Sequence, residues 1–361
     1  MNILVTGAGG FIGKNLVQWL KQSRPDDTLM LCDVDNAADL ENFCLNADFV
    51  FHLAGVNRPE NPADFERGNA GLTEMVFEYC RKGKKPPVLL TSSAQASLDN
   101  PYGISKKAAE DAAHKYTKET GSKTHIYRLP GVFGKWCRPN YNSVVATFCH
   151  NIAHGIPIQI NDPSAELQLV YIDDVCNAFI NTLNNGDFCE VKPIHSITLG
   201  GLADTLNSFY QSRHNLHVAD MSSPLIYKLY STYLSYLPNF AYDLKSHADN
   251  RGSFTEFLKT QSHGQISINI TKPGITKGNQ WHHSKNEKFL VVSGQGLINL
   301  RKLGETEIIQ HPVNDTILTV VDIPPGYIHN ITNTGQIDLV TIMWANEPFN
   351  PEKPDTFFEE V

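Results

Sequence analysis

The sequence has little of what marks secreted, membrane-spanning or nucleic-acid-binding proteins. Its seven cysteines all precede residue 190, their number is odd, and none forms a C-x-x-C pair. This distribution argues against a disulfide framework and favours reduced, mostly buried thiols. No apolar run approaches the ~20 residues that a membrane span requires, and the sequence does not open with a charged segment followed by an apolar one. We therefore expect a cytoplasmic protein without membrane insertion.

Charge is also sparse, and slightly negative. Charged residues make up 19% of the 361 residues, and the formal net charge is −8. Because the chain is mildly acidic overall, we do not expect a nucleic-acid partner. Hydrophobic residues supply 41% of the sequence, which is typical of a globular chain. At roughly 150 residues per domain, the length predicts two domains.

Strand-like and helix-like segments alternate over the first 180 residues. The expected strands are 2–5, 28–32, 49–53 and 88–91, and the expected helices are 14–21, 73–82 and 106–120. Such alternation predicts an α/β fold with a doubly wound, parallel, Rossmann-like sheet. From about 185 to 245 the pattern is less regular. Four tyrosines there have helical spacing, which favours a packed helix over an aromatic ligand site: Tyr227, Tyr230, Tyr233 and Tyr236.

The pattern changes near residue 246. Short strand-like segments follow, separated by Gly, Pro and Asn: 265–270, 288–292, 296–300, 316–321 and 338–343. Many short strands with turn signals predict an all-β sandwich or jelly-roll barrel. We therefore place a domain boundary there, with one domain over residues 1–245 and a second over 246–361.

A glycine-rich segment directly follows the first expected strand. Gly7, Gly10 and Gly13 form a G-x-x-G-x-x-G motif between that strand and a helix. Glycines at such a turn let the pyrophosphate of a dinucleotide approach backbone N–H groups, and the helix N-terminus attracts the anion. We expect NADH or NADPH to bind at these glycines and at Phe11 and Ile12.

Two further segments are candidates for contact with the cofactor. Asp33 ends the second strand, about 20 residues after the glycines. A carboxylate there accepts hydrogen bonds from ribose hydroxyls and repels a 2'-phosphate; the alternative is a solvated turn residue. Leu53, Ala54 and Gly55 follow the next strand, where small side chains let the cofactor pass close to the backbone.

Tyr102 and Lys106 form a Y-x-x-x-K pair at the start of an expected helix. The i, i+4 spacing places both side chains on one helix face. A neighbouring ammonium lowers the pKa of a phenol from its unperturbed value of ~10. Tyr102 can then exchange a proton near neutral pH while hydride moves between cofactor and substrate. Ser93, at the end of the preceding strand, can hydrogen-bond the same carbonyl oxygen.

These motifs resemble the extended short-chain dehydrogenase/reductase family over about residues 1–245. The resemblance includes Asn69 and the segments 128–134 and 171–175, which are similar to the family's R-x-x-x-V-Y-G and Y-V-x-D-V patterns. It implies that Ser93, Tyr102 and Lys106 are the catalytic Ser, Tyr and Lys. Ser93 lies only nine residues before Tyr102, which is closer than is usual in the family.

Histidines and a glutamate recur in the β-rich part of the sequence. Period-two alternation places Gln280 and His282 on one face of a strand, whereas Glu287 comes from the next strand and His329 from a distant one. Two imidazoles and a carboxylate that converge inside a barrel form a site for Zn²⁺ or Fe²⁺.

The segments around these residues resemble the two cupin motifs, and P-x-G-x-x-H-x-x-x-N is matched in full at 324–333. Gln280 stands where the cupin pattern has a His. The resemblance implies either a divalent metal held by His282, Glu287, His329 and Gln280, or a metal-free cupin in which these groups bind otherwise. The segment 249–254 resembles the metal-free sugar-epimerase cupins. That resemblance implies that Arg251 contacts the nucleotide portion of the substrate; the alternative is a turn arginine.

The order of the two parts resembles the CapF-type family of bifunctional enzymes of capsular polysaccharide synthesis, with matches at 133–137, 141–144 and 286–289. The resemblance implies that the cupin epimerises carbon 3 of UDP-2-acetamido-2,6-dideoxy-4-hexulose and that the reductase reduces the carbon-4 ketone with NADPH. The product leads to N-acetyl-L-fucosamine for capsular or O-antigen polysaccharide. We also expect a homo-oligomer, such as a homodimer. Two alternatives stay open: a nucleotide-sugar epimerase that retains its nicotinamide cofactor, and a non-enzymatic nicotinamide-sensing regulator.

Overall fold

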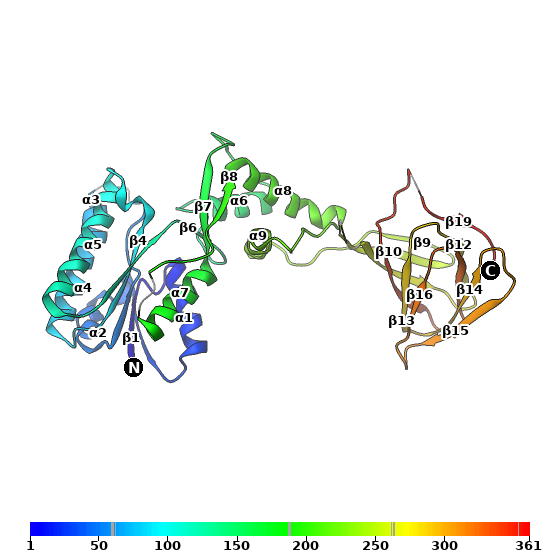
Figure 1. Ribbon diagram of the computed structural model, residues 1–361, viewed down its shortest axis with the longest axis horizontal. Helices are drawn as coiled ribbons and strands as arrows, with labels where there is room; N and C mark the ends of the chain where they lie inside the picture. Colours follow the sequence, from blue (N-terminus) through cyan, green and yellow to red (C-terminus); the bar gives the residue numbers. More distant parts are fainter. Residues whose placement is uncertain (59–60, 62, 187–188, 261, 263, 353) are drawn as a thin grey trace. The chain divides into compact units, whose positions relative to one another are not determined.

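The computed structural model describes residues 1–58, 61, 63–186, 189–260, 262, 264–352 and 354–361. Residue contacts divide the chain into two compact units (Figure 1). Unit 1 consists of Met1–Leu206 and Lys228–Pro238, and unit 2 consists of Asn207–Tyr227 and Asn239–Val361. The boundary that we place near residue 246 stays a prediction. Among the described residues, no helix has the length and apolar character needed to cross a membrane.

Unit 1 is built on a parallel sheet with the strand order β2-β1-β3-β4-β5. Its strands are β1 (Asn2–Thr6), β2 (Thr28–Cys32), β3 (Phe49–His52), β4 (Val88–Ser93) and β5 (Thr124–Leu129). The helical segments between them are α1 (Phe11–Ser23), η1 (Val34–Asp39), α2 (Leu40–Asn46), α3 (Ala63–Phe65), η2 (Glu66–Gly71), α4 (Leu72–Lys82), η3 (Ala94–Ser97) and α5 (Pro101–Thr120). The doubly wound Rossmann-like fold predicted from the alternating pattern is confirmed.

The two faces of this sheet bury alternate residues of each strand. In β1, Ile3 and Val5 pack with α1 and with α7 (Ile172–Asn185), whereas Leu4 packs on the other face with α2, α4 and α5. Figure 1 shows these two helical layers on either side of the sheet. Because strand side chains alternate between faces, every central strand must be apolar on both sides. This is why the strands appear in the sequence as short continuous apolar runs.

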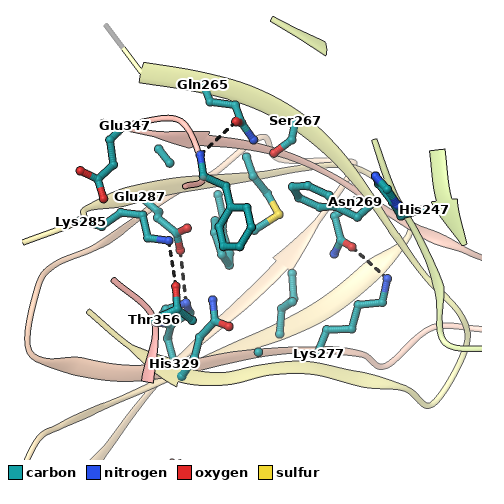
Figure 2. A pocket seen from close by; sticks show the side chains of 18 residues that line it. His247, Gln265, Ser267, Asn269, Lys277, Lys285, Glu287, His329, Glu347 and Thr356 are labelled. Atoms are coloured by element: carbon teal, nitrogen blue, oxygen red, sulfur yellow. Dashed lines mark hydrogen bonds and ion pairs between the residues drawn. The ribbon is translucent and has the colours of Figure 1, made fainter. Parts of the chain in front are cut away.

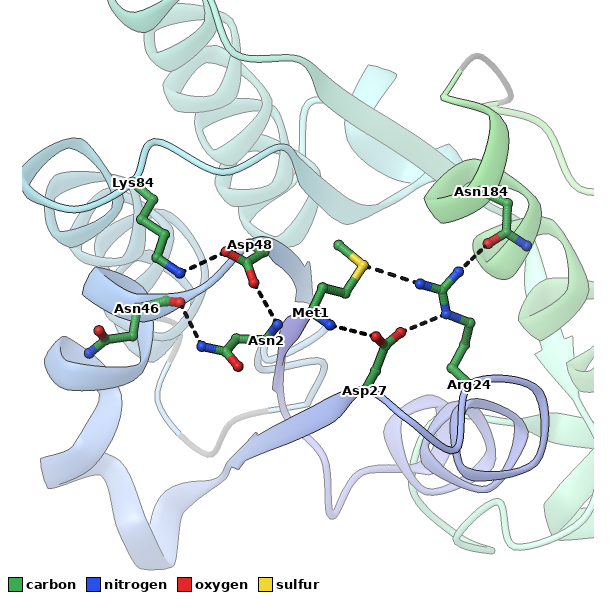
Figure 3. Close-up of polar contacts among 8 residues, drawn as sticks. All are labelled: Met1, Asn2, Arg24, Asp27, Asn46, Asp48, Lys84 and Asn184. Carbon is green, nitrogen blue, oxygen red and sulfur yellow. Dashed lines mark hydrogen bonds and ion pairs between the residues drawn. The ribbon is translucent and has the colours of Figure 1, made fainter.

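Polar contacts fasten the amino edge of the sheet (Figure 3). The Asp48 carboxylate accepts hydrogen bonds from the backbone N–H of Asn2 at 2.7 Å and from Lys84 at 2.7 Å. Arg24 pairs with Asp27 at 2.6 Å and also donates to Asn184 on α7 at 2.7 Å. These contacts lie at the edge opposite the carboxyl ends of the strands, where ligands bind in open α/β sheets.

A smaller sheet and three helices complete unit 1 and lead into unit 2. The strand order is β6-β7-β8, with β6 parallel and β8 antiparallel to β7. The elements are β6 (Gly131–Phe133), α6 (Val144–Ala153), β7 (Glu166–Tyr171), β8 (His195–Thr198), α8 (Leu199–Asn215) and α9 (Pro224–Leu234). The helix predicted from the tyrosine spacing is α9. It buries Tyr233 and leaves Tyr227 exposed, as a packed surface helix does.

From residue 246 on, unit 2 is all-β and consists of two antiparallel sheets, as predicted for a cupin-like fold. Their strand orders are β16-β13-β18-β11-β10-β9 and β15-β14-β17-β12-β19. The strands are β9 (Ser246–Asp249), β10 (Gly252–Thr260), β11 (Gly264–Thr271), β12 (Thr276–Trp281), β13 (Glu287–Ser293), β14 (Gln295–Lys302), β15 (Ile308–Asn314), β16 (Val320–Ile323), β17 (Tyr327–Asn333), β18 (Leu339–Ala345) and β19 (Phe357–Phe358). Apolar side chains from both sheets, among them Phe289, Ile298 and Ile331, form the core between them.

One predicted strand, 316–321, is wrong in its position. The strand is β16, which begins only at Val320. Before it, the Asn314 side chain accepts hydrogen bonds from the backbone N–H groups of Thr316 and Ile317, each at 2.9 Å. This local side-chain cap holds the backbone in a turn, and it outweighs the β-propensity of Thr316, Ile317 and Leu318.

Candidate active sites

The glycine-rich turn lies at the carboxyl end of β1 and depends on having no side chains. Gly7 has a φ of +68°, and a Cβ atom on it would lie 2.8 Å from backbone atoms of Ala54. A Cβ atom on Gly13 would lie 2.1 Å from the carbonyl oxygen of Gly7. Gly10 is the N-cap of α1 and forms no side-chain capping bond. The first N–H groups of α1 can therefore receive a phosphate, while Phe11 and Ile12 pack against the core.

Asp33 is positioned against this turn. It directly follows β2, and its Oδ2 accepts a hydrogen bond of 2.5 Å from the backbone N–H of Gly9. A Cβ atom on Gly9 would lie 2.3 Å from the same oxygen. The carboxylate is thus held at the rim of the cofactor turn, where the sequence predicts contact with the adenosine ribose.

The chain after β3 is fixed by an unusual helical turn. Asn69 lies in η2, a π-helix, and its side chain accepts from the Val56 N–H at 2.9 Å and donates to the Val56 carbonyl at 3.0 Å. A Cβ atom on Gly55 would lie 2.7 Å from the Asn69 side-chain oxygen and 3.2 Å from the Lys106 nitrogen. Leu53, Ala54 and Gly55 therefore run between the glycine-rich turn and the Tyr102–Lys106 pair. Single-turn π-helices of this kind are frequent at functional sites.

Tyr102 and Lys106 lie in the first turns of α5. Asn100 caps this helix by accepting from the Gly103 N–H at 2.8 Å, and Pro101 begins it. The Tyr102 hydroxyl donates to the Asn57 side-chain oxygen at 3.0 Å. Lys106 is buried, and its ammonium nitrogen lies 5.9 Å from the centre of the Tyr102 ring.

Ser93 ends β4, and its interaction with Tyr102 lowers the pKa of that phenol. The Ser93 side chain accepts from the Gln95 N–H at 3.2 Å at the start of η3. The short η3 turn reverses the chain between β4 and α5. It is the physical reason why nine residues suffice to bring Ser93 and Tyr102 together.

The expectation that Lys106 lowers the pKa of Tyr102 is wrong for this structure. Burial raises the pKa of Tyr102 above its ordinary value, and the interaction with Ser93 offsets this only in part. The Lys106 ammonium donates to the Thr91 carbonyl at 3.3 Å, and burial lowers the pKa of Lys106 to about 8. Lys106 is therefore the group of this pair that titrates nearer to neutral pH.

In unit 2, His282, Glu287 and His329 converge in the interior. His282 follows β12, Glu287 begins β13 and His329 lies on β17. The Glu287 Oε2 lies 3.5 Å from the His282 Nε2 and 3.3 Å from the His329 Nε2. All three atoms are buried and have no hydrogen-bond partner among the described residues. In their protonated form, the two imidazoles outweigh the opposing effect of burial and lower the pKa of Glu287 to about 2.

A cavity of about 450 Å³ opens beside these residues (Figure 2). Glu287, His329 and Gln280 line it, and Gln280 is the cross-strand neighbour of His329. In Figure 2, Lys285 lies beside Glu287, whereas Lys277 and Asn269 approach each other farther along the cavity. Lys277 donates to the Asn269 side chain at 2.9 Å. The cavity is large enough for part of a sugar nucleotide.

Arg251 lies in the turn between β9 and β10, where it pairs with Asp249 at 2.7 Å and is 60% exposed. His247, on the neighbouring strand β9, lines the cavity. Arg251 is not among the described residues that line it. The Arg251 guanidinium donates twice to the Asp249 Oδ2, two residues away, which fits a turn arginine. A role of Arg251 in binding the substrate stays a proposal.

Sequence reasoning missed several residues of the two sites. Asn57 was not predicted to contact Tyr102, because the two are 45 residues apart. The one local signal for a role of Asn57 in the site is its position shortly after Ala54 and Gly55, the small residues that follow β3. Lys285 and Lys277 were also missed as cavity residues, although Lys285 lies within the predicted Gln280–Glu287 segment and Lys277 shortly before it.

The chain belongs to the NAD dependent epimerase/dehydratase family, whose model matches residues 3–195. A second family model, the polysaccharide biosynthesis C-terminal domain, matches residues 247–357. The family implies a nicotinamide dinucleotide as cofactor, in agreement with the glycine-rich turn.

Two relatives match both units. The UDP-2-acetamido-2,6-beta-L-arabino-hexul-4-ose reductase of Pseudomonas aeruginosa is 46% identical over 99% of this chain and 98% of its own. The crystal structure of the capsular polysaccharide assembling protein CapF of Staphylococcus aureus is 48% identical and covers 100% of both chains, with a TM-score of 0.94. The predicted membership of a CapF-type enzyme family is confirmed. A UDP-glucuronic acid 4-epimerase of Bacillus cereus, solved with NAD, covers 65% of this chain and 98% of its own at 18% identity and a TM-score of 0.56, and shares the fold.

Proposed function

We propose that this protein is a bifunctional enzyme that acts on a UDP-linked keto-sugar. Unit 2 epimerises carbon 3 of UDP-2-acetamido-2,6-dideoxy-4-hexulose, and unit 1 reduces the carbon-4 ketone with NADPH or NADH. The product leads to N-acetyl-L-fucosamine for capsular or O-antigen polysaccharide. The observation that carries the proposal is the end-to-end similarity to a reductase of this substrate class, together with the Ser93–Tyr102–Lys106 cluster.

The reduction assigns one task to each residue of that cluster. A reduced nicotinamide bound at the glycine-rich turn would supply the hydride for carbon 4. Tyr102 donates a proton to the ketone oxygen, and its raised pKa keeps the phenol protonated over the working pH range. Ser93 orients the phenol and the ketone oxygen. The Lys106 ammonium stabilises the negative charge that remains on Tyr102 after proton transfer.

Epimerisation must precede reduction. The ketone at carbon 4 acidifies the C–H bond at carbon 3, and reduction removes that ketone. The cavity of unit 2 offers a deprotonation site that does not need the nicotinamide. Two separate sites that share one intermediate therefore explain why both units are present in one chain.

A divalent cation, Zn²⁺ or another, fits the residues at the base of the cavity. Burying three ligand atoms without hydrogen-bond partners destabilises the fold unless a cation binds them. Imidazole nitrogens and carboxylate oxygens are ligands that suit Zn²⁺. His282, Glu287 and His329 would hold the cation, and Gln280 would be a weak fourth ligand. The cation would supply a Lewis acid that polarises the ketone. In a metal-free cupin, the same groups would bind the sugar directly.

One experiment tests both activities. The protein is incubated with the UDP-keto-sugar and NADPH or NADH in deuterated water, and NMR follows carbon 3 and carbon 4. We expect deuterium at carbon 3 and net oxidation of the cofactor. Epimerisation without net oxidation would support a nucleotide-sugar epimerase that retains its nicotinamide, and absence of both reactions would support a nicotinamide-sensing regulator. The homo-oligomer and the cytoplasmic location stay predictions.

A further inference from the structure

The segment around Asp355 packs against the turn between two of the candidate cation ligands. This turn joins β12 to β13 and lies between His282 and Glu287. The Asp355 carboxylate accepts three of its backbone N–H groups, from His283 at 2.8 Å, Ser284 at 2.8 Å and Lys285 at 2.9 Å. It also accepts the Ser284 hydroxyl at 3.0 Å. A carboxylate that receives four hydrogen bonds from one turn fixes the backbone of that turn.

The backbone of Asp355 acts on the ligand itself. Its carbonyl oxygen lies 2.5 Å from the His282 Nδ1. A carbonyl only accepts, so Nδ1 carries a hydrogen, and Nε2 of the neutral ring keeps its lone pair. That Nε2 is the buried, unpartnered atom that faces Glu287. The contact therefore selects the tautomer and the ring orientation that a cation needs, which is what outer hydrogen bonds to metal-bound imidazoles do.

Neighbouring contacts hold the Asp355 segment in place. Thr356 accepts a hydrogen bond of 3.0 Å from Lys285. Phe357 stacks on Trp281 at a ring distance of 4.8 Å, and β19 pairs with β12 in antiparallel register. The segment is thus an extra edge strand beside the ligand-bearing strand, and Asp355 lies where this strand meets the turn.

We propose that Asp355 is a positioning residue for a divalent cation held by His282, Glu287 and His329. Its carboxylate holds the 283–285 turn, and its carbonyl holds His282. The inference rests on the cation site of the proposed function and deepens it. A purely structural role, in which Asp355 stabilises the fold without affecting the cation, is the competing interpretation.

The test uses the full chain, stripped with chelator and titrated with Zn²⁺ against a competing indicator. Asp355→Asn keeps the size of the side chain and the backbone carbonyl, but it loses the charge and replaces one of the two acceptor oxygens with an NH₂ donor. We expect its Zn²⁺ affinity to fall about 10- to 100-fold, and the rise in Tm on adding Zn²⁺ to shrink. Asp315→Asn is the matched control, because Asp315 also accepts a backbone N–H, that of Gly294 at 2.9 Å, in another turn of the same unit. Its Zn²⁺ affinity should equal that of the parent.

The outcomes separate this inference from the proposals on which it rests. If the parent binds Zn²⁺ and Asp355→Asn binds it equally well, the inference is overturned and the cation site stands, even if the variant has a lower Tm. If the parent binds no divalent cation, both the cation site and the inference fall, and carbon-3 exchange by the parent still tests the proposed function. Should Asp355→Asn fail to fold, Ser284→Ala replaces it. We expect a several-fold loss of affinity, and an unchanged affinity overturns the inference.

Discussion

Tyr102 is the residue that we propose as the proton donor in ketone reduction. Because it is the proposed proton donor, Tyr102→Phe should lower the rate of reduction by about 10²- to 10⁴-fold. The phenyl ring keeps its packing against Phe65, at a ring distance of 5.6 Å, so cofactor binding should change little. Single-turnover hydride transfer and cofactor titration measure the two effects. Reduction at the parent rate would show that the assignment of Tyr102 is wrong.

Lys106 should set the alkaline limb of the pH profile of reduction. Burial lowers its pKa to about 8, whereas burial raises that of Tyr102, so the ammonium is the first of the two groups to lose a proton. We expect kcat/KM to fall above about pH 8. The same shift makes the contribution of Lys106 to the free energy of unfolding rise with pH between about 8 and its ordinary value of 10.5, because burial penalises the charged form.

The control for this profile is Lys106→Arg, whose guanidinium keeps its charge at high pH. Its residual activity should lack the limb near pH 8. A parent profile that stays flat to pH 10 would contradict the role of Lys106.

Asp33 should allow NADH to be used well. Its carboxylate, held against Gly9, would repel the 2'-phosphate of NADPH and accept the free ribose hydroxyls of NADH. The residue thus opposes the NADPH preference that the CapF-type resemblance implies. We expect any preference for NADPH in kcat/KM to stay below about a hundredfold, or ~2.7 kcal/mol. A larger preference for NADPH would refute this interpretation of Asp33.

At the scale of elements, the pairing of β12 with β17 places Gln280 opposite His329. Gln280→His would add an imidazole at the position where the cupin pattern has one. We expect tighter Zn²⁺ binding and slower loss of metal to chelator, because a neutral imidazole is a better Zn²⁺ ligand than an amide oxygen. Metal analysis before and after chelation compares the parent with the variant. If neither protein binds a divalent ion, the domain is a metal-free cupin.

Elements built from local signals were predictable from the sequence. The glycine-rich turn, the helix that carries Tyr102 and Lys106, and the central strands each depend on residues that are close in sequence. Contacts across long separations were not, such as Asn57 with Tyr102 and Asp355 with the turn after His282. The error at 316–321 has another cause: one Asn314 side chain caps a turn, and propensity alone does not reveal it.

At the scale of the whole molecule, the two activities should be separable. A fragment of residues 246–361 contains the strands and the cavity of unit 2, and it should still exchange the carbon-3 proton for deuterium without nicotinamide. The structure adds a refinement: Lys259 on β10 forms two backbone hydrogen bonds of 2.8 Å with Leu216 and Val218. A fragment that starts at residue 207 keeps them and should have the higher Tm. A folded fragment that shows no exchange would contradict independent active sites.

The contact between Asp33 and Gly9 has a consequence for protein engineering. The carboxylate both faces the cofactor and holds the loop that receives it, so replacing Asp33 to favour NADPH also releases that loop. A side chain on Gly9 would in turn displace the Asp33 carboxylate, because a Cβ atom would lie 2.3 Å from it. Positions 9 and 33 therefore form one design unit. A library that varies them together samples cofactor specificities that neither position reaches when it is changed alone.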